Sequence, residues 1–169
     1  MHPVTRALLF SAGLAICLSH CSGPARAGTV EQALAVACPG HENWAPYVQS
    51  ASRHWMVHPV LLVAVMEHES GCRMGKVGAH GERCAMQLLG VARNGRSNRE
   101  LADPAICIDT GARWLSLREL DCGSKYLGLD GYNARKCKHG RKYARRVLAL
   151  ERRIWKELER NSARRSIVR

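Results

Sequence analysis

The feature that most constrains this chain is an apolar run in its first half. Residues from Leu61 to Met66 are apolar on almost every side of a helix, which is typical of a helix buried at the centre of a domain. Pro59 fits the first position of that helix, and Ser70 and Gly71 follow its last turn. The other elements are therefore expected to pack around this helix.

The remaining patterns predict mostly further helices. The expected ranges are residues 28–37, residues 44–55, a helix that begins at Asp103-Pro104, and residues 141–160. The second and the last of these have one apolar face at helical spacing. Strand-like alternation is nearly absent, and six glycines between Gly71 and Gly95 indicate irregular backbone. The sequence predicts a single compact, mainly α domain, α or α+β, with at most a small hairpin.

The first 27 residues have the pattern of an export signal. Arg6 precedes an apolar stretch, and Ala25-Arg26-Ala27 is a small-x-small cleavage pattern. A lipoprotein signal acylated at Cys21 is the alternative. We expect the folded domain to span residues 28–160, a basic disordered tail to follow over 161–169, and the protein to be periplasmic or secreted by a bacterium.

Six cysteines follow residue 27, and an even number in a small exported domain favours disulfides. Short spacing alone suggests that Cys72 pairs with Cys84 and that Cys122 pairs with Cys137. No cysteine pair has the close spacing of zinc ligands. His54 and His58 are four residues apart, but Pro59 starts a new segment there. We therefore expect no metal site and no cofactor.

The net charge of +12 is concentrated at the C-terminal end. Residues 28–134 hold 10 basic and 11 acidic side chains, whereas residues 135–169 hold 14 basic and 3 acidic ones. This end could be attracted to anionic wall polymers or to lipid headgroups. It could also be the solvated face of a helix whose other face packs in the core. Nucleic-acid binding is not expected of an exported protein.

Glu69 is the strongest candidate for chemistry, because it directly follows the apolar run. Burial raises the pKa of a carboxyl group, since the charged form is poorly solvated, and a raised pKa keeps a proton available to a general acid near neutrality. Cleavage of a glycosidic bond needs such a proton on the leaving oxygen. The alternative is a helix-end carboxylate paired with an arginine. Glu67 points to another side of the helix, where we expect it to be exposed or ion-paired.

Several short motifs occur together with Glu69. They are Glu69-Ser70, then Gly81 with Met86-Gln87, then Asp103-Pro104 with Gly111-Ala112, and finally Gly131-Tyr132-Asn133. With these motifs, residues 56–150 resemble the lytic transglycosylase domain related to goose-type lysozyme. Cys84-Ala85 replaces the family's Gly-Leu, and Cys72 stands where an aromatic residue is usual. We therefore expect a Cys72–Cys84 disulfide to hold this loop in place of aromatic packing.

The resemblance implies a mechanism with one carboxylate. Glu69 would protonate the oxygen between N-acetylmuramic acid and N-acetylglucosamine, and the acetamido group of the substrate would stabilise the developing positive charge. Glu69 would then activate the 6-hydroxyl, which closes a 1,6-anhydro ring. Ser70 would orient the substrate or Glu69. The substrate-binding residues would also include Met86, Gln87, Tyr132 and Asn133. The implied partner is the glycan strand of peptidoglycan, bound by a monomer.

Other interpretations stay open at this point. A water-using muramidase would need a second acid, for which Asp103, Asp109 and Asp130 are candidates. A non-catalytic protein for wall binding or secretion-system assembly would keep the groove and would not need Glu69. A cationic antimicrobial or nucleic-acid-binding protein would depend on the charge alone. Tyr132 could also be a packed aromatic side chain of the core.

Overall fold

The computed structural model describes residues 27–137 and 142–167. Residues 1–26 of the predicted signal, including Cys21, lie outside these ranges. The α-helices are α1 (Ala27–Ala37), α2 (Ala45–Trp55), α3 (Pro59–Ser70), α4 (Pro104–Cys122), α5 (Lys125–Ala134) and α6 (Lys142–Ile167). Short 3-10 helices are η1 (Glu42–Trp44), η2 (Gly90–Arg93) and η3 (Glu100–Ala102). The described residues form no strand, only isolated bridges at Val77–Arg83 and Arg83–Leu88. The predicted mainly α fold is confirmed.

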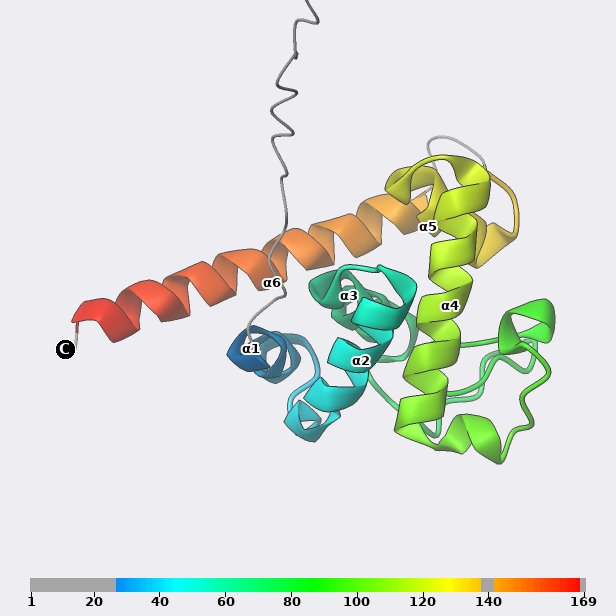
Figure 1. Cartoon of the computed structure of the whole chain (residues 1–169), viewed down its shortest axis with the longest axis horizontal. Coiled ribbons are helices and arrows are strands. Elements are labelled where there is room, and N and C mark those ends of the chain that lie inside the picture. The colour runs from blue at the N-terminus through cyan, green and yellow to red at the C-terminus, as the bar shows by residue number, and fades with distance from the viewer. Residues whose placement is uncertain (1–26, 138–141, 168–169) are drawn as a thin grey trace, which may run out of the picture.

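Helix α3 lies at the centre of the domain (Figure 1). Its residues from Pro59 to Met66 are buried, and it packs against α1, α2 and α6. The imidazole Nδ1 of His58 accepts a hydrogen bond from the Val60 amide at 3.3 Å and so caps its first turn. Gly71 ends it in the left-handed conformation with φ of +62°, which glycine adopts without steric cost. The apolar run is therefore a central helix, as predicted.

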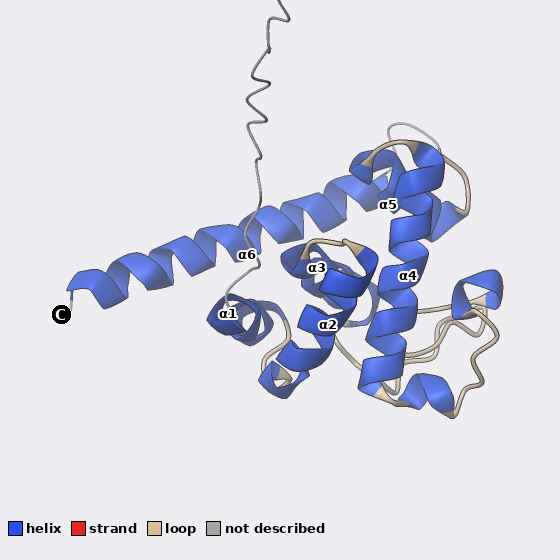
Figure 2. Cartoon of the chain, in the orientation of Figure 1, coloured by secondary structure: helices blue, strands red, loops and turns tan. Residues whose placement is uncertain are grey.

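The segment between α3 and α4 is mostly loop and lies on one side of α4 (Figure 2). Gly111 allows this close approach, because a Cβ atom there would lie 2.5 Å from the terminal methyl of Met86. Asp103 caps α4 by accepting a hydrogen bond from the Ala105 amide at 2.7 Å. The loop is therefore packed against a helix although its backbone is irregular.

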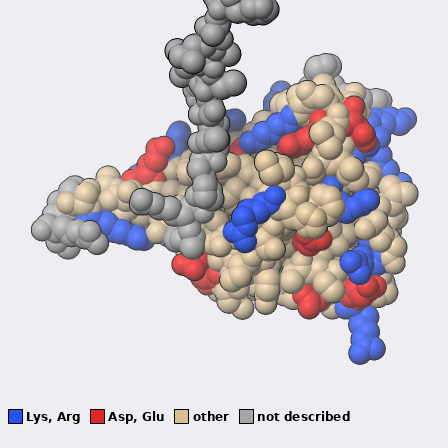
Figure 3. Space-filling model, viewed as in Figure 1, with Lys and Arg blue, Asp and Glu red and all other residues tan. Residues whose placement is uncertain are grey.

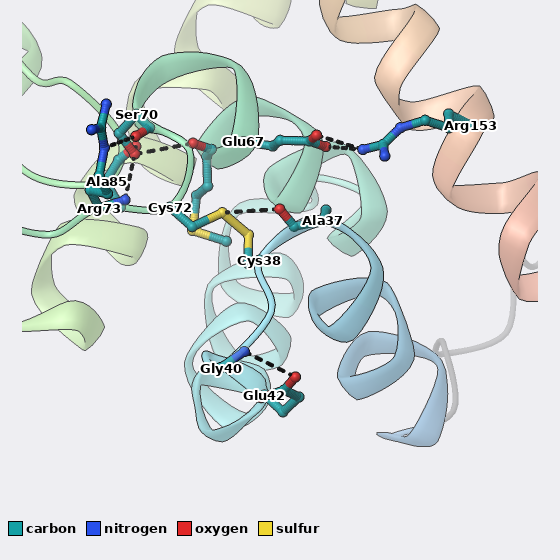
Figure 4. Close-up of a disulfide and its surroundings, with 11 residues drawn as sticks. Ala37, Cys38, Gly40, Glu42, Glu67, Ser70, Cys72, Arg73, Ala85 and Arg153 are labelled. Carbon is teal, nitrogen blue, oxygen red and sulfur yellow. Dashed lines mark hydrogen bonds and ion pairs between the residues drawn. A yellow bond between two sulfur atoms is a disulfide. The ribbon is translucent and has the colours of Figure 1, made fainter.

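The described residues contain three disulfides, Cys38–Cys72, Cys84–Cys107 and Cys122–Cys137. The predicted Cys122–Cys137 pair is confirmed, and the predicted Cys72–Cys84 pair is wrong. Cys72 follows the left-handed end of α3 and turns toward the end of α1, where Cys38 lies (Figure 4). Cys84 lies further along the loop, against α4. Short spacing misleads here because the loop turns between the two cysteines.

Helix α6 is longer than predicted. The first part of the helix buries Tyr143, Ala144, Val147, Ile154 and Leu158, and its far end extends beyond the body of the domain (Figure 1). It continues to Ile167 through the segment where the sequence suggested a disordered tail. Arginine and alanine favour helix, which is consistent with a helix that continues there without core contacts.

The surface charge is mixed on the face that Figure 3 shows, with acidic side chains among the lysines and arginines. Glu67 forms an ion pair with Arg153 of α6, one of the two environments predicted for it. Within the described ranges, no helix has both the length and the apolar character that crossing a membrane requires.

Candidate active site

Glu69 lies in the last turn of α3 and is mostly buried. The Tyr143 hydroxyl of α6 donates a hydrogen bond to Glu69 Oε1 at 2.6 Å, and Lys76 Nζ donates to the Glu69 main-chain oxygen. Burial raises the pKa of Glu69 from an ordinary 4.5 to about 7. The Tyr143 hydrogen bond and the charge of Lys76 lower this pKa, and the carboxylate of Glu82 raises it. A carboxyl group with this pKa can hold or release a proton near neutrality.

A cleft of about 120 Å³ opens beside Glu69. Its walls come from α3, from the loop, from α4 and from the end of α5. The lining residues are Glu69, Glu82, Gln87, Leu88, Leu89, Ala92, Trp114, Tyr132, Asn133 and Arg135. The structure thus brings together four of the predicted site residues, Glu69, Gln87, Tyr132 and Asn133, from three separate segments.

Tyr132 both packs in the core and lines the cleft. Its side chain is 7% exposed, and its hydroxyl donates a hydrogen bond to the Met86 main-chain oxygen at 2.7 Å. The indole Nε1 of Trp114 donates to the Tyr132 main-chain oxygen at 3.3 Å. Burial raises the pKa of Tyr132, so the hydroxyl stays neutral. Tyr132 therefore fixes α5 to the loop, and its hydroxyl is already engaged with the protein.

Gln87 has a left-handed backbone, with φ of +48°. Its side-chain Nε2 donates hydrogen bonds to the main-chain oxygens of Lys76 at 3.2 Å and of Cys84 at 2.9 Å. A side-chain amide has only two N–H donors, so both are engaged within the loop. What Gln87 offers to the cleft is its carbonyl oxygen, Oε1.

Ser70 and Met86 were also predicted to bind substrate, but neither lines the cleft. Ser70 is 1% exposed, and its hydroxyl lies 2.9 Å from the Ala85 oxygen and accepts from the Arg73 amide at 3.0 Å (Figure 4). It therefore joins the end of α3 to the loop. Met86 is fully buried and packs against Gly111. Both residues position the walls of the cleft.

The three aspartates suggested as a second acid also lie outside the cleft lining. Asp103 caps α4. Asp109 accepts a hydrogen bond from Trp55 Nε1 at 2.8 Å, and Asp130 is fully buried in α5. Among the described residues, no group of three His, Cys, Asp or Glu side chains could hold a metal ion.

Several residues of this site were not predicted from the sequence, among them Tyr143 and Glu82. Tyr143 has the spacing of a core residue on the apolar face of the last helix, and no spacing rule connects it with Glu69, 74 positions earlier in the chain. The ring of His68 contacts Tyr143 edge-on at 5.0 Å and supports its orientation. Glu82 lies inside the motif that ends in Gln87, and a carboxylate within that motif was the available signal.

A buried, protonatable carboxyl group beside a cleft lined by amide and aromatic side chains is what a general acid for glycosidic-bond cleavage needs. The family model described as Transglycosylase SLT domain matches residues 46–152, more than half of the chain. The chain therefore belongs to the SLT transglycosylase family, a family of peptidoglycan lytic transglycosylases, and the resemblance found in its sequence is confirmed. A comparison with curated proteins finds no match.

Proposed function

We propose that this chain is an exported lytic transglycosylase. It cleaves the β-1,4 bond between N-acetylmuramic acid and N-acetylglucosamine and leaves a 1,6-anhydro end. Membership of the SLT family supports peptidoglycan as the substrate. The observation that carries the proposal is Glu69, whose burial raises its pKa to about 7 at the wall of a cleft lined by polar and aromatic side chains.

In the first step, protonated Glu69 transfers its proton to the leaving oxygen of N-acetylglucosamine. The bond from C1 of the muramic sugar to that oxygen breaks, and the carbonyl oxygen of the 2-acetamido group forms a bond to C1. The Tyr143 hydroxyl, 2.6 Å from Glu69 Oε1, stabilises the carboxylate that this step leaves behind. Because Tyr143 holds Oε1, Oε2 exchanges the proton with the substrate.

In the second step, the Glu69 carboxylate accepts the proton of the 6-hydroxyl. The 6-oxygen bonds to C1 as the bond from the acetamido oxygen to C1 breaks, so no water is consumed. Glu69 ends the cycle protonated and ready for the next bond. A single carboxyl group with a pKa of about 7 suits both steps, because neither its acid nor its base form is strongly disfavoured at neutral pH.

The same proposal includes location and partners. Three disulfides fit an extracytoplasmic compartment, which supports export. We propose that the protein acts as a monomer and that exposed basic residues of α6, such as Arg152, Lys156 and Arg160, attract it to anionic wall polymers or lipid headgroups. Salt-sensitive binding to isolated sacculi or anionic vesicles, weakened by glutamine at these three positions, is the expected result. Binding that does not weaken with added salt would contradict this electrostatic attraction.

The test of the activity is product analysis on isolated sacculi by liquid chromatography and mass spectrometry. The wild type should release anhydromuropeptides, and Glu69→Gln should lower the release by at least about 100-fold, since a general acid contributes at this scale. Glu67→Gln is the matched control on the same helix and should retain activity. Reducing N-acetylmuramic ends would point to a hydrolytic muramidase. Full activity of Glu69→Gln would contradict the assigned chemistry.

A further inference from the structure

The cleft holds a second carboxylate, Glu82, which the mechanism above does not use. Glu82 lies on the loop, and its Oε2 accepts a hydrogen bond from the His80 amide at 2.9 Å. A Cβ atom at Gly78 would lie 2.1 Å from Glu82 Oε2 and 2.8 Å from Gln87 Oε1. The carboxylate of Glu82 and the side-chain carbonyl of Gln87 therefore both lie next to Gly78, which has no side chain to separate them.

This wall of the cleft offers hydrogen-bond acceptors. Both N–H donors of Gln87 are engaged by main-chain oxygens, so its Oε1 remains for a ligand, and an ionised carboxylate can only accept. Hydrogen bonds from backbone amides lower the pKa of Glu82, whereas burial raises that of Glu69. Near neutrality Glu82 is ionised while Glu69 can still carry its proton. Two carboxyl groups whose pKa values are pushed apart in one cleft are suited to different roles.

The proposed reaction creates a donor that matches this wall. When the acetamido oxygen bonds to C1, the positive charge is shared with the acetamido nitrogen, which keeps its N–H. A fixed carboxylate that accepts this N–H stabilises the charge as it develops and holds the acetamido group in the orientation for attack. The charge disappears again when the 6-oxygen displaces the acetamido oxygen from C1.

We propose that Glu82, with Gln87 Oε1 beside it, accepts the N–H of the acetamido group on the sugar whose bond is cleaved. This inference rests on the proposed function and assigns the substrate-assisting step to a named residue. The competing explanation is that Glu82 only braces its own loop through the His80 amide. The two differ in what they predict for ligands that carry positive charge at that nitrogen.

The test compares two probes by calorimetry on the wild type and on Glu82→Gln. One probe is the thiazoline analogue of N-acetylglucosamine, which mimics the bicyclic intermediate and becomes cationic when protonated. The other is neutral tri-N-acetylchitotriose. Glu82→Gln should weaken thiazoline binding roughly ten-fold, because an ion-to-ion contact at a cleft rim contributes on the order of 1 kcal/mol, and should change chitotriose binding far less. Turnover of sacculi should also fall roughly ten-fold.

Two further variants sharpen the result. Glu159→Gln removes the same charge from an exposed position of α6 and should leave both affinities unchanged. Gly78→Ala keeps Glu82 ionised but displaces it together with Gln87, so it should reproduce the loss of thiazoline binding. Thermal melting of each variant shows whether the fold is retained.

Each remaining outcome has a defined meaning. If Glu82→Gln weakens the binding of both probes equally, or of neither probe, the acetamido role is overturned in favour of a role in holding the loop. Reducing products from the wild type that shift toward anhydro products in Glu82→Gln overturn both the proposed function and this role, in favour of a residue that activates water. If the wild type cleaves no sacculi, the proposed function itself fails. If the wild type cleaves and Glu82→Gln binds and cleaves like it, only the role of Glu82 fails.

Discussion

Glu69→Gln should stabilise the protein above neutral pH while it removes activity. Glu69 has a pKa of about 7 in the folded protein against an ordinary value of 4.5. Its ionised form is therefore disfavoured by folding. Since one pKa unit corresponds to about 1.36 kcal/mol, the shift corresponds to about 3 kcal/mol of lost stability once the group is ionised in both states. Gln keeps an oxygen for Tyr143 and carries no charge.

The sign of the pH dependence follows from the raised pKa. Below pH 4.5 the carboxyl group is protonated in both states, and the wild type loses no stability from ionisation. As the pH rises from 4.5 to about 7, the unfolded chain ionises first, so the wild type loses stability progressively relative to Glu69→Gln. Above about pH 7 the difference is constant.

Urea unfolding of both proteins at pH 4, 6 and 8 measures this difference. The free energy of unfolding of Glu69→Gln, relative to the wild type, should increase by about 3 kcal/mol between the first and the last pH. Glu67→Gln, which removes a carboxylate from the same helix, is the control, and the pH-dependent gain should be absent there. A difference for Glu69→Gln that does not change with pH would refute the argument that burial sets the pKa of Glu69.

Two further predictions concern Tyr143 and the Cys122–Cys137 disulfide. The Tyr143 hydrogen bond lowers the pKa of Glu69, so Tyr143→Phe should raise that pKa and move the alkaline limb of the pH–rate profile to higher pH. An alkaline limb at the same pH or at a lower pH would contradict this. The Cys122–Cys137 disulfide spans 15 residues, and replacing both cysteines by serine should lower the free energy of unfolding by about 3 kcal/mol in a urea titration. A loss well under 1 kcal/mol would show that α5 is held by packing alone.

The sequence predicted the central helix and the buried position of Glu69 at its end because both depend on local patterns. The apolar run, the proline at the first helical position and the glycine after the last one are contiguous in the chain. The helix expected to begin at Asp103-Pro104 is another local pattern, and Asp103 caps it. Family motifs added Gln87, Tyr132 and Asn133, which lie far apart in sequence and together in the cleft.

The features that the sequence did not predict depend on where the side chains of residues far apart in the chain point. Tyr143 has the spacing of a core residue and is buried as one, yet its hydroxyl reaches Glu69, which helical periodicity cannot show. Ser70 stands next to Glu69 in sequence, but its side chain points to the Ala85 oxygen, away from the cleft lining. The Cys72–Cys84 prediction failed because six cysteines define no unique pairing by spacing alone.

Each of the three described disulfides lies in or next to a segment that lines the cleft. Cys72 lies three residues after Glu69, at the end of the helix that carries it, and is bonded to Cys38 beside α1. Cys84 lies between Glu82 and Gln87 and is bonded to α4 through Cys107. Cys122 and Cys137 bracket α5, which carries Tyr132 and Asn133. Each segment that supplies polar groups to the cleft is thus covalently anchored at or next to those groups.

This arrangement suits a small domain that keeps a carboxyl group buried at its centre. The burial that raises the pKa of Glu69 lowers the stability of the fold at neutral pH. The main-chain hydrogen bonds of the glycine-rich loop beside it form turns and isolated bridges instead of a helix or a strand pair. A cross-link stabilises mainly by restricting the unfolded chain, so it offsets that loss without filling the cleft. Cys72 and Cys84 are buried and lie outside the cleft lining, so their disulfides hold the loop while the cleft stays open.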